Sequence, residues 1–490
     1  MTNPAPLEPV DRRSAAAESA RSHAWFVRTL GLGALLLFLY AYAPSARIPF
    51  RIEQWDYYHF FATYPFDSTR LRDWLLMAFW TPFGDFRFLP LAYLWNFAAF
   101  SILGPGNFGL WTLALGLNVL NSLLLARWVS ALRGYKGLDH GLVAAALFLL
   151  LPARHEVVIW TFFSYKLAHT ALVLGALILI EAYVADRRRG PLAGAVALLF
   201  LSWMFYEASL PVALVIPVRL ALSGQAFSCR EKRWVLTSLL VPCLAYGALR
   251  LVAHLHVPAA FGLDNHIPWL AVSAWTFVES LWKWVLEGAV LGNSGLPIIP
   301  LYTAFQLGFR TVAEGAAAFF VPLTWGVLLS QLRWRPFPLK EVAYLACVAA
   351  AASILLLVGR TLTSGSELLA RVSMYQHVPT LFLAATLGYV VDRSLEARRF
   401  AAPTLLLLVA LLAVGSRQAV GTYMRAQAPL FEALARVERV VRERPDAKIY
   451  AGDVQLPFVP TWGISNAEHS YHAFRLLYGD RIVREKPGRQ

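Results

Sequence analysis

The sequence predicts an all-α polytopic membrane protein. Of its 490 residues, 58% are hydrophobic and only 15% are charged, whereas an ordinary globular protein has about 45–50% apolar residues. The apolar residues gather in runs of about 17–22, the length at which a helix spans a bilayer core of about 30 Å. Short clusters of Lys and Arg separate many of the runs, which is typical of cytoplasmic loops.

The net charge of +14 does not indicate a nucleic-acid partner. Nucleic-acid-binding proteins gather their basic residues on one soluble face, but here the basic residues lie in short loops between apolar runs. This distribution suits the surface of an anionic membrane. The three cysteines form no closely spaced pattern and predict neither a disulfide framework nor a zinc site.

A transmembrane domain is predicted over residues 24–420, after a Pro-, Ala-, Ser- and Arg-rich N-terminus, residues 1–23, that we expect to be disordered and cytoplasmic. Residues 191–224 are predicted to cross twice with Glu207 at the turn, so that either each helix is short or Glu207 lies within the thickness of the membrane. With about eleven spans, an odd number, the C-terminus lies on the outer face. The predicted spans are 24–43, 107–130, 138–152, 167–185, 191–205, 208–224, 234–255, 311–331, 341–359, 374–391 and 402–420.

Two long outer loops, 44–106 and 256–310, are not simply polar. Their Trp-rich stretches at 68–100 and 269–290 predict helices that lie in the membrane interface. The alternative is that either stretch forms a further short span. The tail, 421–490, has an amphipathic helix pattern followed by strand and loop patterns, and it predicts a small outer αβ domain.

Mixtures of acidic and basic residues occur only in the predicted outer segments. A charged side chain near a membrane is energetically costly, so these residues are candidates for function. Glu53 and Asp56 follow the first span, among aromatic residues that favour a carboxylate tuned as a general base. The alternative is an ordinary loop acid or a partner for Arg51.

The loop after the third span carries His155 and Glu156, and Lys166 lies at its end, just before the next span. These residues could orient a substrate, hold a divalent ion, or form an ion pair at a helix end. Their spacing in the sequence is consistent with all three roles. Glu207 interrupts an apolar helix pair, so it needs a partner in space or a proton. Arg371 lies at the outer start of the tenth predicted span. There it could bind a phosphate at the membrane surface or simply anchor the helix in the interface.

In this order, the motifs resemble the GT-C superfamily of polytopic glycosyltransferases, and among them the dolichyl-phosphate-mannose-protein mannosyltransferases and the O-mannosyltransferases that carry tetratricopeptide repeats. Two departures are Tyr206, where the family pattern has Lys, and a short tail in place of the repeats. The stretches that carry the resemblance are Trp55-Asp56-Tyr57, Phe86-Arg87-Phe88-Leu89-Pro90-Leu91, residues 151–160, residues 206–211 and residues 371–379.

The resemblance implies an inverting transfer of a sugar from a polyprenyl-phosphate-linked lipid to an acceptor hydroxyl on a protein, lipid or glycan, at the outer face of a bacterial inner membrane. Asp56 is then the general base, and Arg371, Lys166 and Arg87 bind the donor phosphate. Glu156, Glu207, His155 and Glu53 position the acceptor or hold a divalent cation, Mg²⁺ or Mn²⁺. Neither the sugar nor the acceptor follows from the resemblance.

Two other classes of function fit the composition. A transporter or flippase of lipid-linked or small polar substrates predicts broken helices related by an internal repeat, and no convincing repeat is visible between the halves of the chain. A non-catalytic envelope assembly protein needs the helices but not Asp56.

Overall fold

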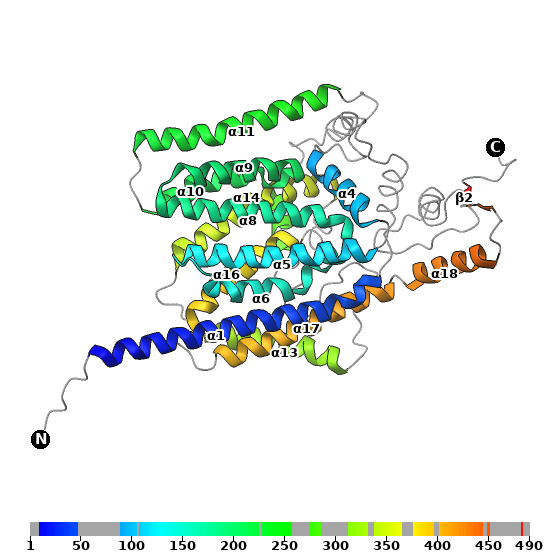
Figure 1. The fold of residues 1–490 in the computed structure, drawn as a ribbon, viewed down its shortest axis with the longest axis horizontal. Helices are drawn as coiled ribbons and strands as arrows, with labels where there is room; N and C mark the ends of the chain where they lie inside the picture. Colours follow the sequence, from blue (N-terminus) through cyan, green and yellow to red (C-terminus); the bar gives the residue numbers. More distant parts are fainter. Residues whose placement is uncertain are drawn as a thin grey trace, which may run out of the picture.

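A computed structural model describes the following parts of the chain: residues 9–47, 89–104, 107–224, 228–256, 274–285, 312–331, 338–364, 376–395, 401–426, 428–443, 448–450 and 482–483. These parts are almost entirely helical, and the long helices run side by side across the view in Figure 1.

Six helices in the described parts are long and apolar enough to cross a membrane, and a bent pair makes a seventh if it counts as one span. The protein is therefore a helical membrane protein. The six candidate spans are Arg21–Arg47, Phe108–Leu132, Thr161–Asp186, Cys229–Val252, Leu339–Leu357 and Ala401–Arg425.

All eleven segments predicted to span contain helix, and six of them correspond to helices in the described residues that are long and apolar enough to cross a membrane. The helices that correspond to them are α1 (Pro9–Tyr42), α5 (Asn107–Leu132), α6 (Leu142–Leu150), α8 (Ser164–Asp186), α9 (Arg189–Phe205), α10 (Val215–Leu222), α11 (Cys229–His256), α13 (Val312–Ser330), α14 (Leu339–Ser364), α16 (His377–Leu395) and α17 (Ala401–Ala426).

Helix α1 begins at Pro9, so the expected disorder of residues 1–23 does not hold for residues 9–23. Proline is favoured at the first position of a helix because it lacks the N–H that would go unbonded there. The alanines that follow, at 15–17 and 20, have the highest helix propensity of any residue. The helix therefore starts well before the apolar run of the first candidate span.

The third predicted span is a bent pair: residues Asp139–Leu150 and Pro152–Ile159 meet at 58°. Pro152 explains the break, since proline cannot donate the backbone hydrogen bond that would continue α6. Three short helices follow the break: the 3-10 helix η4 (Pro152–Arg154), α7 (His155–Ile159) and the 3-10 helix η5 (Thr161–Phe163). All residues from 151 to 163 are buried.

Residues 191–224 form two short helices, as predicted, joined by the 3-10 helix η6 (Glu207–Leu214). Pro211 lies inside η6 and prevents a continuous α-helix there. Glu207 is the first residue of η6, so it lies at the turn between the helices.

Helices α5, α8 and α9 pack in that order, while α6 packs against α1, α5 and α16 (Figure 1). Two glycines allow close approach around α6. A Cβ on Gly388 of α16 would overlap the backbone of Ala144, and a Cβ on Gly141, just before α6, would overlap the backbone of Ala126 in α5. Because any larger residue would push these helices apart, the glycines set the spacing at the centre of the bundle.

Of the two Trp-rich outer stretches, the described parts are helices α4 (Pro90–Leu103) and α12 (Ala274–Trp282). Helix α4 packs on α8 and α9, and α12 packs on α14. Trp275 and Trp282 are exposed, as residues that face lipid or the interface would be.

The tail contains the predicted amphipathic helix, α18 (Ala428–Glu443), and a two-residue parallel pair of strands, β1 (Ile449–Tyr450) and β2 (Ile482–Val483). The predicted helix near 467–478 lies outside the described residues. Helix α18 and the strands lie beyond one end of the bundle, and α1 begins at the other end (Figure 1).

Candidate functional site

Buried polar side chains gather at the end of the bundle from which α18 continues. They come from the bent link after α6, from the first turns of α8, from the start of α16 and from the turn before η6. The link and these helix ends are neighbours in space: η4 packs on α16 and α17, and η5 packs on α5.

Arg154 is the most buried charged residue at this end, with no exposed surface. Its Nε donates to the backbone oxygen of Phe148 at 2.8 Å, and its Nη1 donates to Asn118 Oδ1 at 2.5 Å. The guanidinium also lies 3.7 Å from the centre of the Phe148 ring. Its Nη2 has no hydrogen-bond partner, and Arg154 forms no ion pair within the part of the chain that the structure describes.

Lys166 lies in the first turn of α8 and is only 8% exposed. Its Nζ lies 4.1 Å from the centre of the Phe163 ring and 5.6 Å from the centre of the Tyr206 ring, so the ammonium group faces aromatic surfaces from two elements. Such contacts stabilise a partly desolvated cation by roughly 1–2 kcal/mol. They hold the ammonium group at the turn that leads to Glu207.

Two buried histidines lie beside these positive groups. His377, at the start of α16, has its Nε2 3.1 Å from Thr170 Oγ1 of α8, and it lies within electrostatic reach of Arg154, Lys166 and His169. His169 packs edge-on against Tyr206 at 5.6 Å. His377 Nδ1 and His169 Nε2 have no hydrogen-bond partner within the described segments. We call Arg154 and Lys166, with His169 and His377 beside them, the cationic cluster.

His155 and Glu156 lie in the link itself and are both buried. His155 Nδ1 is 3.1 Å from the backbone oxygen of Pro152, and the ring packs edge-on against Tyr423 of α17. Glu156 takes part in the hydrogen-bonded turn that ends α7, where its backbone oxygen accepts from Trp160 at 2.7 Å. The structure therefore places both predicted residues in the link that carries Arg154.

Glu207 follows Tyr206, whose ring contacts both Lys166 and His169. Its Oε2 is buried and has no hydrogen-bond partner in the described segments, while Tyr246 of α11 lies within electrostatic reach. The turn is tied down by a hydrogen bond of 2.9 Å between Ser202 and Ser209. Glu207 thus lies near the cationic cluster but on its α9 and α11 side.

Of the predicted site residues, the structure brings His155, Glu156, Lys166 and Glu207 to one end of the bundle. Asp56, Glu53, Arg87 and Arg371 lie outside the described residues. Glu156 and Glu207 do not belong to any group of possible metal ligands within the described part of the chain. We therefore derive no step through a metal at this end.

Sequence reasoning missed His169 and His377 as site residues, and it considered Arg154 only as one member of the polar loop that contains His155 and Glu156. The sequence marks each of the three as a candidate, because all three interrupt or border apolar runs. A polar side chain is energetically costly there and is therefore a candidate for function. His169 also follows Lys166 by three residues, which puts the two on one face of a helix.

The cationic cluster can bind an anion. Buried charges are normally paired. Two buried carboxylates elsewhere in the described bundle follow this rule, because Glu181 accepts from Arg219 at 2.6 Å and Asp392 contacts Arg133. Arg154 instead keeps an unbonded N–H donor, as do the histidines if their free nitrogens carry hydrogen. Phosphate oxygens are strong acceptors for such donors.

The fold and this end of the bundle define the molecule as a helical membrane protein with a buried cationic cluster where four segments meet. Comparison of the chain with protein-family models and with curated protein sequences finds no match.

Proposed function

We propose that the protein is a membrane glycosyltransferase of the GT-C type, which moves a sugar from a polyprenyl-phosphate-linked donor to an acceptor hydroxyl. In this proposal the chain crosses a bacterial inner membrane about eleven times. The N-terminus is cytoplasmic, and the tail forms a small αβ domain on the outer face, beside the cationic cluster.

The observation that supports the proposal most strongly is the convergence of the motifs. Residues 151–160, residues 206–211 and the described part of 371–379 are far apart in the sequence, and each was expected to serve the reaction. Lys166 and His169 contact Tyr206, Thr170 contacts His377, and η4 packs on α16. These contacts bring the three stretches together around positive groups, as a donor with a phosphate leaving group requires.

The donor phosphate is held, in this proposal, by Lys166 together with Arg371 and Arg87. Lys166 supplies an ammonium group that already lies against the rings of Phe163 and Tyr206. Interactions aimed at charge that develops on the leaving group contribute most to the rate. Arg154 is anchored by Asn118 and the Phe148 carbonyl, so it supplies a fixed positive charge behind the site.

Asp56 acts as the general base. The acceptor oxygen attacks the anomeric carbon and loses its proton to the Asp56 carboxylate, while the bond between that carbon and the phosphate oxygen breaks. The lipid phosphate leaves with the bonding electron pair, and the anomeric configuration is inverted. Glu156, Glu207, His155 and Glu53 position the acceptor.

A transporter or flippase of lipid-linked substrates is the second candidate, and one observation favours it. The bent pair at Leu151 is a broken helix beside buried polar groups, a feature that transporters use to bind substrates. In a transporter, however, the cluster would bind the lipid-linked substrate without breaking a bond to the sugar.

Purified protein in nanodiscs and in sealed vesicles, incubated with radiolabelled polyprenyl-phosphate sugars, distinguishes the candidates. Transfer to an acceptor or hydrolysis of the donor supports the enzyme. Movement of intact donor between leaflets without any cleavage supports the transporter and contradicts the enzyme. If neither is seen with any donor, the chain is a non-catalytic assembly protein.

A further inference from the structure

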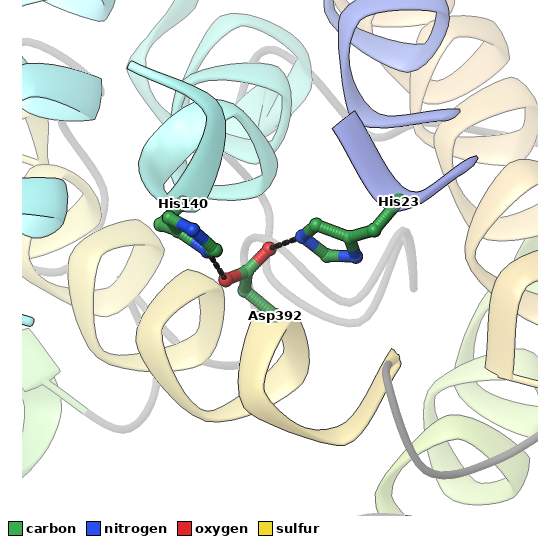
Figure 2. A group of neighbouring side chains, drawn as sticks. All are labelled: His23, His140 and Asp392. Atoms are coloured by element: carbon green, nitrogen blue, oxygen red, sulfur yellow. Dashed lines mark hydrogen bonds and ion pairs between the residues drawn. The ribbon is translucent and has the colours of Figure 1, made fainter. Parts of the chain in front are cut away.

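A second polar cluster lies at the opposite end of the bundle, and no part of the proposed sugar transfer uses it. It consists of His23 near the start of the first span, His140 just before α6, and Asp392 near the end of α16 (Figure 2). His140 precedes α6 and the link with Arg154 follows it, so a full helix separates the two clusters.

The three side chains offer ligand atoms that all lie within 4.8 Å of one another. His23 Nε2 is 3.2 Å from Asp392 Oδ1, and His140 Nδ1 is 3.3 Å from Asp392 Oδ2. Figure 2 shows both imidazoles pointing at the carboxylate from opposite sides. Two ligands bound to one zinc ion at about 2.1 Å stand about 3.4 Å apart when the site is tetrahedral. Each nitrogen therefore lies about as far from the carboxylate as a neighbouring ligand to the same ion would.

The surrounding residues hold the imidazoles in place. The Tyr135 ring stacks on His140 with ring centres 3.7 Å apart, and His140 stacks on His23 at 5.5 Å. Arg28, one and a half turns beyond His23 on α1, donates two hydrogen bonds of 2.8 and 2.9 Å to Asp139, next to His140. Supporting contacts of this kind orient the ligands of a metal site.

Arg133 also contacts Asp392, and it neutralises the fully buried carboxylate by itself. Charge balance therefore does not require the two histidines. In the same position, the Arg133 guanidinium lies 5.7 Å from the centre of the Tyr135 ring. A cation that binds to Asp392 would compete with Arg133 rather than add to it.

We propose that His23, His140 and Asp392 bind a divalent first-row transition metal ion, with Zn²⁺ as the best match. Two imidazole nitrogens and one carboxylate oxygen suit zinc and its neighbours, whereas Mg²⁺ and Ca²⁺ prefer oxygen ligands alone. The ion joins α1, the turn before α6 and α16, three segments that are otherwise held at this end by Arg28 and Arg133. This inference does not depend on the sugar-transfer proposal.

The test uses the full-length protein in detergent, stripped with a chelator and titrated with Co²⁺, whose visible spectrum reports its nitrogen and oxygen ligands. The wild type is expected to bind Co²⁺ with a saturable absorption band that Zn²⁺ displaces. His140→Ala and Asp392→Asn should each weaken binding by at least about a hundredfold, the upper end of what loss of a supporting residue costs. His256→Ala, which removes a histidine from the end of α11, should leave the titration unchanged.

Arg133→Gln separates a metal site from a simple ion-pair network. If Arg133 competes for Asp392, its removal should tighten Co²⁺ binding by about tenfold. If the wild type shows no saturable band and Arg133→Gln also binds no Co²⁺, the cluster is an ion pair with two neighbouring histidines and the proposal is wrong. Binding that is equal in the wild type and His140→Ala contradicts it as well, and both outcomes can be read in folded protein.

Discussion

Arg154 Nη1 donates to Asn118 Oδ1 at 2.5 Å, and neither side chain has any exposed surface. Asn118 lies near the middle of α5, where its Nδ2 donates back to the Ala114 carbonyl at 2.9 Å. The amide is therefore oriented with its oxygen toward the guanidinium. An interior arginine held in this way keeps its charge in a fixed position within the cationic cluster.

We expect Asn118→Ala to destabilise the protein by about 2 kcal/mol, because it leaves a buried guanidinium without one of its acceptors. Chemical unfolding in mixed micelles measures the change. Thr112→Ala is the matched control on the same helix, since it removes an exposed hydroxyl that bonds only to the Phe108 backbone, and its effect should stay within about 0.5 kcal/mol. Equal effects of the two substitutions would contradict a role for Asn118 in holding Arg154.

The close approach of α16 and α6 makes a second prediction. Gly388→Ala places a methyl group against the Ala144 backbone and should cost about 1–3 kcal/mol through overpacking. Gly116→Ala in α5 meets no atom within 4 Å, and there the better helix propensity of alanine should stabilise the protein by up to about 1 kcal/mol. Thermal unfolding of both variants in one detergent gives the comparison, and a Gly388→Ala protein as stable as the wild type would show that the helices lie farther apart.

The general base makes a third prediction. Asp56→Asn keeps the shape of the side chain but removes its ability to accept a proton, so the rate of sugar transfer should fall by about 10²–10⁴-fold. Binding of the donor lipid should change little, because the proton is transferred only during the reaction. Asp73→Asn alters another acid of the same predicted loop and should keep the wild-type rate.

Full transfer activity in Asp56→Asn would remove Asp56 from the mechanism. If that variant binds the donor more weakly but transfers sugar from the bound donor at the wild-type rate, Asp56 serves donor binding rather than proton transfer.

Much of the fold could be predicted because the bilayer imposes its own rules on the sequence. Apolar runs predicted helix in all eleven segments, and Glu207 marked the break between α9 and α10. The extent of α1 could not be predicted from composition alone, because the same Ala-rich segment suits both disorder and helix. Helix α9 is apolar but shorter than the helices that meet the length criterion for a span.

The candidate site could be predicted only in part, for a physical reason. A charged residue in an apolar run is a candidate for function, which is how Glu207 was found. Lys166 was found because it lies with His155 and Glu156 in a short loop between two predicted spans. Which polar residues meet depends on helix packing. His377 reaches Thr170 across 207 residues of sequence, and Asp392 reaches His140 across 252. No local pattern encodes such distances.

The most direct test of the central claim compares Lys166→Met with Lys232→Met in transfer from a radiolabelled polyprenyl-phosphate sugar. Methionine keeps an unbranched stem but removes the charge, and Lys232 is an exposed lysine on α11, outside the cluster. We predict that Lys166→Met weakens donor binding by roughly tenfold to a hundredfold, the value of one hydrogen bond to a charged group, while Lys232→Met behaves as the wild type. Equal donor affinity and equal transfer in both variants would contradict the account.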